Sequence, residues 1–154
     1  MNIAIEQAGL RDLRGSHSTT VYSSRRDAAS IDQKSVSSMN RTYRGSCHCG
    51  RVKFEVDLDP GNAVVCDCSI CTKKGVIINR VGEDQFRLST PLDDLGLYQF
   101  NKRIAKHYYC RTCGIHTFNR PRSAPDMWAV NMRCLADLDL TQLEPRQAQG
   151  SKLD

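Results

Sequence analysis

The sequence lacks several features that define large functional classes. It has no run of about 18 apolar residues, so no transmembrane helix is expected. Its N-terminus has no apolar stretch of the kind that a secretory signal needs, and we expect a cytoplasmic protein. It also has no glycine-rich phosphate loop, no Ser/His/Asp set and no carboxylate pair with credible spacing. These absences argue against membrane proteins, phosphate-loop nucleotide enzymes and the common hydrolases.

Residues 1–40 differ from the rest of the chain. They contain no cysteine and few large apolar residues, and they follow neither a helical nor a strand period. We interpret them as a disordered extension. They carry five basic and four acidic side chains, so they are nearly neutral and are not a strong phosphate-binding arm. Glu6, Asp12 and Asp27 argue against a mitochondrial transit peptide.

From Thr42 onwards the pattern is that of short strands. Val52, Phe54 and Val56 alternate with charged residues, which indicates a half-buried strand, and a turn is expected at 59–62. Further strands are expected at 76–78, 86–88, 97–100, 104–109, 116–118 and 127–132, with one helical turn at 69–74 and a short terminal segment at 135–143. The prediction is a single all-β or β-rich domain at residues 41–145, followed by a tail at 146–154.

Seven of the eight cysteines fall into three clusters: Cys47-x-Cys49, Cys66-x-Cys68-x-x-Cys71 and Cys110-x-x-Cys113. In an intracellular chain, thiols at this spacing are more often metal ligands or catalytic groups than disulfide partners. Zinc takes four protein ligands in a closed structural site and three in a site that keeps a position for water or substrate. Seven thiols are therefore enough for one site of each kind.

The first and third clusters are favoured for the closed site. Each places a glycine directly after its second cysteine, Gly50 and Gly114, and glycine permits the positive φ of a tight turn around a metal. Two thiolates from each cluster would complete a tetrahedron and join distant parts of the chain. A partition in which the middle cluster supplies two of these ligands is also compatible with the spacing.

The middle cluster supplies three thiolates within six residues, which cannot complete a zinc tetrahedron. The fourth position would be open to water, a free thiol or a substrate atom, as a catalytic zinc requires. In the alternative both zinc sites are structural, and the fourth ligand is His48, His107, His116 or Cys134. Cys134 has no partner nearby in the sequence, and we expect it to be a buried structural thiol.

The formal net charge of +5 is a weak argument for a nucleic-acid partner. Thiols that bind a metal lose their protons. Seven thiolates subtract seven charges and two zinc ions add four, which leaves a net charge of +2. Binding to nucleic acid is therefore not expected from the charge of the chain.

Three segments together resemble the glutathione-dependent formaldehyde-activating enzyme family, which also contains centromere protein V. They are Gly45-Ser46-Cys47-His48-Cys49-Gly50, Cys66-Asp67-Cys68-Ser69-Ile70-Cys71 and Tyr109-Cys110-Arg111-Thr112-Cys113-Gly114. The segment Val130-Asn131-Met132-Arg133-Cys134-Leu135 is also similar to that family. The resemblance covers about residues 42–140, and the order of three clusters at these spacings makes it specific.

The resemblance implies small twisted β-sheets held by zinc, with two zinc ions per chain. It implies a structural zinc on Cys47, Cys49, Cys110 and Cys113 and a second, catalytic zinc on Cys66, Cys68 and Cys71. The implied activity is that of a carbon–sulfur lyase, which in the synthetic direction joins glutathione and formaldehyde into S-hydroxymethylglutathione. Centromere protein V implies a different role, a non-catalytic zinc module that binds protein or nucleic acid. Thiol chemistry on other electrophiles is a third interpretation.

Basic residues near the middle cluster are candidates for binding the thiol substrate. Lys73 and Lys74 lie two and three residues after Cys71 and are predicted to contact a glutathione carboxylate. Arg80, Arg103 and Arg111 are further anion-binding candidates. The alternative for each of these five side chains is an ordinary solvated surface.

Overall fold

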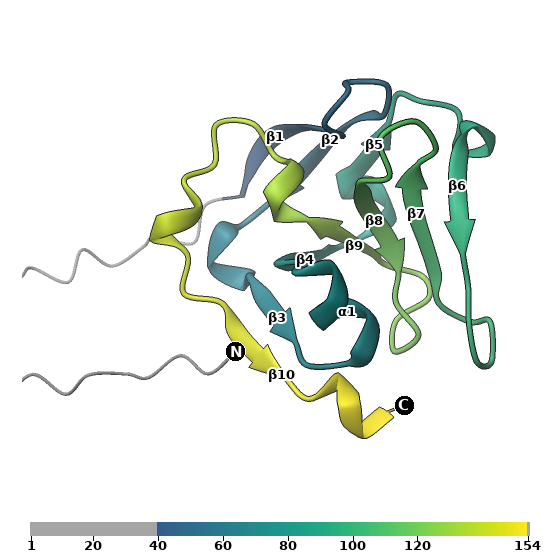
Figure 1. Cartoon of the computed structure of the whole chain (residues 1–154). Coiled ribbons are helices and arrows are strands. Elements are labelled where there is room, and N and C mark those ends of the chain that lie inside the picture. Colours follow the sequence, from purple (N-terminus) through teal and green to yellow (C-terminus); the bar gives the residue numbers. More distant parts are fainter. Residues whose placement is uncertain (1–39, 154) are drawn as a thin grey trace, which may run out of the picture. The chain divides into compact units, whose positions relative to one another are not determined.

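The structure is a computed structural model that describes residues 40–153, and these residues form a β-rich fold of two sheets (Figure 1). The smaller sheet has three antiparallel strands in the order β1 (Arg41–Ser46), β2 (Lys53–Leu58) and β5 (Phe86–Leu88). The burial of β2 alternates along its length, because its apolar residues face the core and its charged residues face solvent. The half-buried strand predicted around Phe54 is therefore confirmed.

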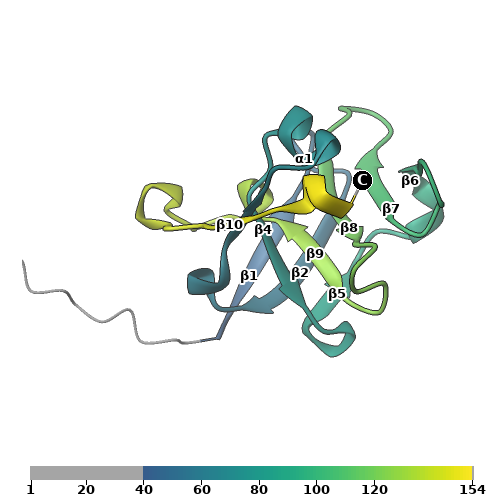
Figure 2. The ribbon, with the colours of Figure 1, turned by 90° about the horizontal axis from the view of Figure 1, so that it is seen from below.

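The larger sheet has seven strands and carries most of the functional residues described below. In spatial order they are β10 (Arg146–Ala148), β3 (Val64–Cys66), β4 (Ile78–Val81), β9 (Trp128–Asn131), β8 (His116–Arg120), β7 (Lys106–Cys110) and β6 (Leu95–Tyr98). Neighbouring strands are antiparallel except β10 and β3, which are parallel. β10 runs alongside β3 and past the short helix α1 (Ser69–Lys74), as Figure 2 shows from below.

The core between the two sheets is built around a cluster of aromatic side chains. Phe118 is fully buried and meets Phe54 and Trp128 edge-on, with ring centroids 5.7 and 5.3 Å apart. Phe86 contacts the same group, with its ring centroid 4.7 Å from that of Trp128. Each such aromatic contact contributes about 0.5–1.5 kcal/mol beyond the burial of apolar area. This core holds rigid the strands that end at the cysteine clusters.

Element boundaries agree with the sequence pattern most closely where a strong end signal exists. The predicted helical turn at 69–74 is α1, which ends at Gly75 in the left-handed conformation with φ of 60°. The strand predicted at 97–100 lies instead at β6, two residues earlier, and the strand predicted at 104–109 begins at Lys106. At 135–143 the described chain forms a single 3-10 turn, Leu140–Gln142, and no longer element.

The C-terminal residues take part in the fold. The expected tail at 146–154 contains β10 and a final 3-10 turn, Gly150–Leu153. The predicted disordered extension at residues 1–40 lies, except for Asn40, outside the described residues. No helix between residues 40 and 153 is long and apolar enough to cross a membrane.

Candidate metal centre

The first cysteine cluster lies in the tight turn between β1 and β2. The Gly50 N–H donates to the carbonyl oxygen of Cys47 at 3.0 Å, and Gly50 has φ of 74°, which favours glycine. The Val52 N–H donates to Cys47 Sγ at 3.3 Å. The turn thus directs one thiol inward and supplies a backbone donor to its sulfur.

The third cluster forms a turn of the same kind between β7 and β8. The Gly114 N–H donates to the carbonyl oxygen of Cys110 at 2.9 Å, and Gly114 has φ of 74°. The Cys110 N–H donates to the carbonyl oxygen of Ile115 at 2.9 Å, which closes the hairpin. The two turns are 61 residues apart in sequence, measured from Cys49 to Cys110, yet their sulfur atoms meet.

The sulfur atoms of Cys47, Cys49, Cys110 and Cys113 all lie within 4.8 Å of one another. Sγ of Cys49 is 3.6 Å from Sγ of Cys47 and 3.7 Å from Sγ of Cys110. A zinc–sulfur bond of about 2.3 Å in a tetrahedron places neighbouring sulfurs about 3.8 Å apart, whereas a disulfide needs about 2.05 Å. All eight cysteines are free thiols. The four-cysteine group therefore fits a tetrahedral metal site.

The backbone around this group favours thiolates at the third cluster. N–H groups of Ile115 and Cys49 lower the pKa of Cys113 to about 6, and the N–H of Cys113 lowers the pKa of Cys110. For Cys49 the N–H of Arg51 acts in the same direction, but burial and the neighbouring thiols together raise its pKa to about 11. Four thiolates repel one another, so a cation is required to keep all four deprotonated.

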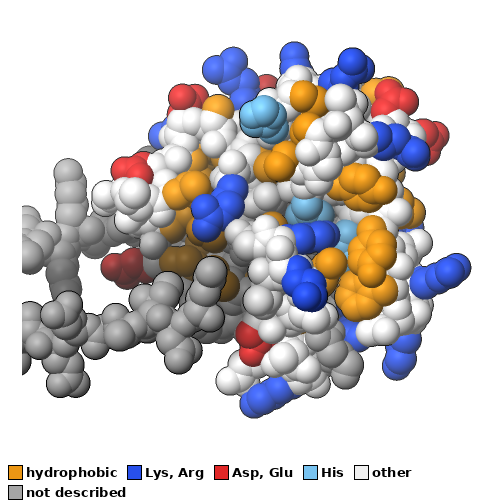
Figure 3. Space-filling model, viewed as in Figure 1, with side chains coloured by type: hydrophobic (Ala, Val, Ile, Leu, Met, Phe, Trp, Pro, Cys, Tyr) orange, Lys and Arg blue, Asp and Glu red, His pale blue; other side chains and the backbone are white. Residues whose placement is uncertain are grey.

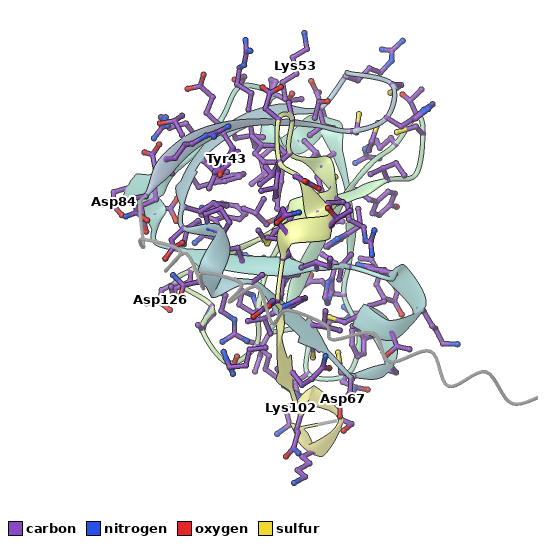
Figure 4. The ribbon with its side chains drawn as sticks, turned by 90° about the vertical axis from the view of Figure 1, so that its left-hand side faces the viewer. Tyr43, Lys53, Asp67, Asp84, Lys102 and Asp126 are labelled. Atoms are coloured by element: carbon purple, nitrogen blue, oxygen red, sulfur yellow. The ribbon has the colours of Figure 1, made fainter. Side chains whose placement is uncertain are left out.

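The middle cluster lies where β3 passes into α1. Cys66 ends β3, Cys68 is the N-cap residue of α1 and Cys71 lies within the helix. Their sulfur atoms lie within 4.8 Å of one another, and all three thiols are half-buried. Within residues 40–153, no further His, Cys, Asp or Glu side chain joins this group of three. Sulfur atoms accordingly gather at two separate places in Figure 4.

The four candidates for an additional protein ligand are placed elsewhere. His48 is exposed, and His107 and His116 are buried in the large sheet. Cys134 Sγ lies 3.7 Å from the carbonyl oxygen of His116 and packs against the core, where burial raises its pKa to about 12. The grouping of sulfur atoms is therefore four and three.

Burial and the neighbouring thiols raise the pKa values of Cys66 and Cys71 in the group of three. Burial raises the pKa of Cys71, and the neighbouring Cys68 and Cys66 raise it further. Burial is also the main reason why the pKa of Cys66 is raised. Three thiolates here need a bound cation at neutral pH, as a soft metal with thiolate ligands would provide.

A cavity of about 110 Å³ opens beside the group of three. Its basic and polar wall consists of Arg80, Asn101, Lys102, His107, Asn119, Arg122 and Ser123, and its apolar wall includes Ile70, Ile78, Phe100, Ile104 and Pro121. No acidic side chain of the described residues lines it. The cavity thus combines three thiols, three basic side chains and an apolar wall.

The floor of this cavity is one transverse row of the large sheet. Arg80 on β4 pairs with Ala129 on β9, which pairs with Asn119 on β8, which pairs with His107 on β7. Directly paired residues project to the same face of a sheet, so this row places three polar side chains together. Sequence reasoning singled out Arg80 as an anion-binding candidate but not the role of Asn119, and only correct strand pairing could have revealed it.

The predicted thiol-binding lysines have different positions. Lys73 is exposed and lines neither this cavity nor the second space of the described residues, an open cleft. Lys74 is half-buried and lines an open cleft of about 770 Å³ together with His116 and Arg133. Burial lowers the pKa of Lys74 to about 8, against the opposing effect of the Cys71 and Cys68 charges. Figure 3 shows histidine, basic and hydrophobic side chains side by side on this face. Arg103 and Arg111 line neither space.

Two buried histidines lie near each other, His107 at the cavity and His116 at the cleft. His107 and His116 are 5 % and 8 % exposed, their ring centroids are 5.9 Å apart, and none of their four ring nitrogens has a hydrogen-bond partner. Burial, together with the charge of Lys74, lowers the pKa of His107 to about 4 and that of His116 to about 2. Both rings are therefore neutral at pH 7.

We expect these histidines to make the folded state acid-sensitive. Their folded pKa values lie below the unfolded value of about 6.5, so the unfolded state binds more protons and stability falls as the pH drops below that value. Denaturant unfolding in excess zinc between pH 6.5 and 5 should show a smaller pH slope for His107→Gln, by up to about 1.4 kcal/mol per pH unit. His48→Gln, at an exposed position, is the control, and equal slopes for His107→Gln and the wild type would contradict this prediction.

Comparison with known proteins agrees with this geometry. Residues 42–150 match the family model described as glutathione-dependent formaldehyde-activating enzyme. A crystal structure of a protein from Rhodobacter sphaeroides is 39 % identical to this chain, covers 68 % of it and 99 % of its own length, and superposes with a TM-score of 0.64. The matched region includes both cysteine groups, the cavity and β10. The chain therefore belongs to the glutathione-dependent formaldehyde-activating enzyme family.

Proposed function

We propose that the protein is a zinc-dependent carbon–sulfur lyase that forms and cleaves the adduct of a small anionic thiol with a small aldehyde, with glutathione and formaldehyde as the pair. The observation that carries this proposal is the group of three thiols beside a cavity with basic walls. A group of four thiols explains a structural metal, whereas a group of three leaves a position for a substrate atom.

The two cysteine groups have different roles in this proposal. Cys47, Cys49, Cys110 and Cys113 hold a structural zinc that joins the β1–β2 turn to the β7–β8 hairpin. Cys66, Cys68 and Cys71 hold the second zinc at the cavity. When bound there, zinc supplies a Lewis acid that favours the thiolate form of a thiol and polarises a carbonyl oxygen.

The cavity walls select the thiol. Glutathione carries two carboxylates, and the positive charges of Arg80 and Lys102 line the cavity together with Arg122. Phe100 and Ile104 give the cavity an apolar side. Opposite charges at such a surface steer the ligand to the site and orient it.

The reaction moves one proton. The thiol sulfur bonds to the aldehyde carbon, the carbonyl π bond breaks, and the proton that leaves sulfur is finally carried by the new hydroxyl oxygen. His107 lines the cavity as a neutral ring, but its nitrogens are buried and its pKa is lowered to about 4, so it is a weak base. In both directions of the reaction the proton passes between sulfur and oxygen through solvent.

The test is the exchange rate between free formaldehyde and S-hydroxymethylglutathione at equilibrium, measured by NMR with purified zinc-loaded protein. Because the uncatalysed addition is fast, the same solution without protein sets the baseline. We expect exchange above that baseline that saturates with glutathione concentration. A rate equal to that of buffer at every concentration would refute the proposed activity.

We expect Lys102→Glu to raise KM for glutathione about three- to tenfold while kcat changes little. An exposed ion pair contributes about 0.2–1 kcal/mol, and charge reversal replaces attraction with repulsion, whereas 1.4 kcal/mol corresponds to tenfold. Lys53→Glu is the matched control, because Lys53 and Lys102 lie at opposite ends of the molecule in Figure 4. Equal KM changes in the two variants would show that the cavity wall does not select the thiol.

A further inference from the structure

The C-terminal segment is bonded to the residue that stands between two of the three cavity thiols. Asp67 follows Cys66 and precedes Cys68, and its N–H donates to the carbonyl oxygen of Ala148 at 3.1 Å. Its carboxylate accepts from the Ser151 N–H at 2.8 Å and from the Ser151 hydroxyl at 2.9 Å. Figure 4 shows Asp67 at the end of the molecule that carries the final turn. Both the backbone donor and the side chain of Asp67 are thus held by residues more than 80 positions away.

β10 holds the first thiol by its backbone. It pairs in parallel with β3, and Ala148 stands opposite Cys66. The pairing begins at Ala63, whose carbonyl oxygen accepts from the Arg146 N–H at 2.9 Å. The backbone of Cys66 is therefore fixed from the edge of the sheet by the last strand of the chain.

Gly150 brings the same segment against the sulfur atoms themselves. A Cβ atom at this position would lie 2.3 Å from Cys66 Sγ and 3.1 Å from Cys68 Cβ. Such a distance is far shorter than van der Waals contact, so no side chain fits without displacing the thiol. Gly150 also lines the cavity, and it therefore forms the wall beside Cys66 and Cys68.

These restraints matter because the turn that carries the thiols has little stability of its own. α1 has six residues, and its N-cap residue Cys68 makes no side-chain capping hydrogen bond. Isolated helices shorter than about 12 residues are marginal in water, and immobilising each backbone residue costs about 1–2 kcal/mol. Without the C-terminal segment, a metal ion would have to order the three thiols as it binds, and it would leave more readily.

We propose that residues 148–151, which we name the C-terminal clasp, are part of the cavity metal site and set how long it retains its metal. The clasp positions Cys66 and Cys68 through Asp67, and Gly150 closes the wall beside them. Three of its residues, Ala148, Gly150 and Ser151, are positioning residues that hold Asp67 and Cys66 in place and donate nothing to the metal. The inference rests on the proposed function, because it requires a metal ion on Cys66, Cys68 and Cys71.

The experiment measures zinc content and the rate of zinc transfer to a chromophoric chelator for the full chain. The wild type should contain two zinc ions per chain and release them in a fast phase, from the group of three, and a slow phase, from the group of four. Ser151→Ala and Asp67→Asn should each accelerate the fast phase about five- to tenfold. The double variant should be no faster than the faster single variant, because both changes break one contact.

Gly150→Ala should have the largest effect, because its methyl group displaces Cys66 Sγ. We expect it to retain one zinc per chain, with the slow phase unchanged. Replacing zinc with Co²⁺ gives a second readout, since the sulfur-to-cobalt absorption of this variant should fall towards that of a single four-thiolate site. Two matched controls should behave as the wild type: Gln149→Ala, whose exposed side chain makes none of the contacts described above, and Lys152→Ala, at the exposed position directly after the clasp.

The outcomes separate the clasp from the proposed function. If the wild type holds two zinc ions and the clasp variants keep both and release them at wild-type rates, the inference about the clasp is wrong and the proposed function is unaffected. A wild type that holds a single zinc, on the group of four, overturns the proposed function and the clasp together. If every clasp variant lowers the melting temperature but leaves both release phases unchanged, the segment has a structural role only and the inference is wrong.

Discussion

Cys110→Ser is expected to leave the chain without a stable fold at 25 °C in excess zinc, whereas Cys66→Ser is expected to fold and to bind one zinc ion. Both substitutions replace one sulfur with oxygen in a β-strand-end cysteine. The difference lies in what each sulfur holds. Cys110 belongs to the group that joins two turns far apart in sequence, and Cys66 belongs to a group confined to six residues.

The magnitude follows from the size of zinc-binding free energies. Structural zinc contributes about 10–16 kcal/mol in small zinc domains at pH 7, and a typical domain is stable by only 5–15 kcal/mol in total. Loss of one of the four ligands removes a large part of the free energy of zinc binding. Cys110 is also only 2 % exposed, so the new hydroxyl is buried beside thiolates. We therefore expect the free energy of unfolding of Cys110→Ser to fall to about zero or below.

Trp128 provides the measurement. It is the single tryptophan of the chain and is 6 % exposed in the aromatic core, so its fluorescence should shift to longer wavelength when the sheets separate. Cys110→Ser should show this shift and lose near-ultraviolet circular dichroism, while Cys66→Ser should match the wild type. A folded Cys110→Ser variant with two zinc ions would contradict the assignment of the four-cysteine group.

The three cysteine clusters could be predicted from the sequence because their information is local, whereas spacing alone left open which two clusters form the group of four. Thiols two to five residues apart cannot separate widely, and a glycine after a cysteine pair indicates a tight turn. The two turns that contain Gly50 and Gly114 have these features, and their sulfur atoms meet as expected. The β-rich class was equally accessible, because the alternation around Phe54 survives in β2.

The cavity could not be predicted because its walls are assembled from distant segments. His107, Asn119 and Arg80 meet only through the pairing of β7, β8, β9 and β4, and a shift of one residue in any pair would turn a side chain to the other face. Gly150 gives no local signal at all. Its role depends on the sulfur atom of Cys66, 84 positions earlier in the chain. The next residue, Asp67, is the one whose carboxylate binds Ser151. Proximity in sequence to Cys71 predicted a role for Lys73 in binding the thiol, but its side chain is exposed and lines neither the cavity nor the cleft.

The three thiols are expected to contribute more to activity than the basic side chains around them. Each basic side chain on the wall adds an exposed ion pair of at most about 1 kcal/mol, so loss of one is partly compensated by the others. A metal ligand has no such substitute. Even the loss of a residue that only supports a ligand costs about 10–100-fold in metal affinity or activity, and loss of a ligand must exceed this.

Cys71→Ser is accordingly expected to reduce the formaldehyde–glutathione exchange rate to that of buffer and to lower zinc affinity at the cavity by more than about 100-fold. The physical reason is that two thiolates cannot hold the ion against water, and the hydroxyl of serine stays protonated at pH 7. Exchange measured by NMR gives the rate, and competition with a chelator gives the affinity. Cys134→Ser is the matched control, because Cys134 is half-buried and belongs to neither group. It should retain two zinc ions and full exchange. If Cys71→Ser accelerated exchange as well as the wild type while it bound a single zinc, the group of three would have no part in the reaction, and the activity would have to be sought at the cleft beside His116.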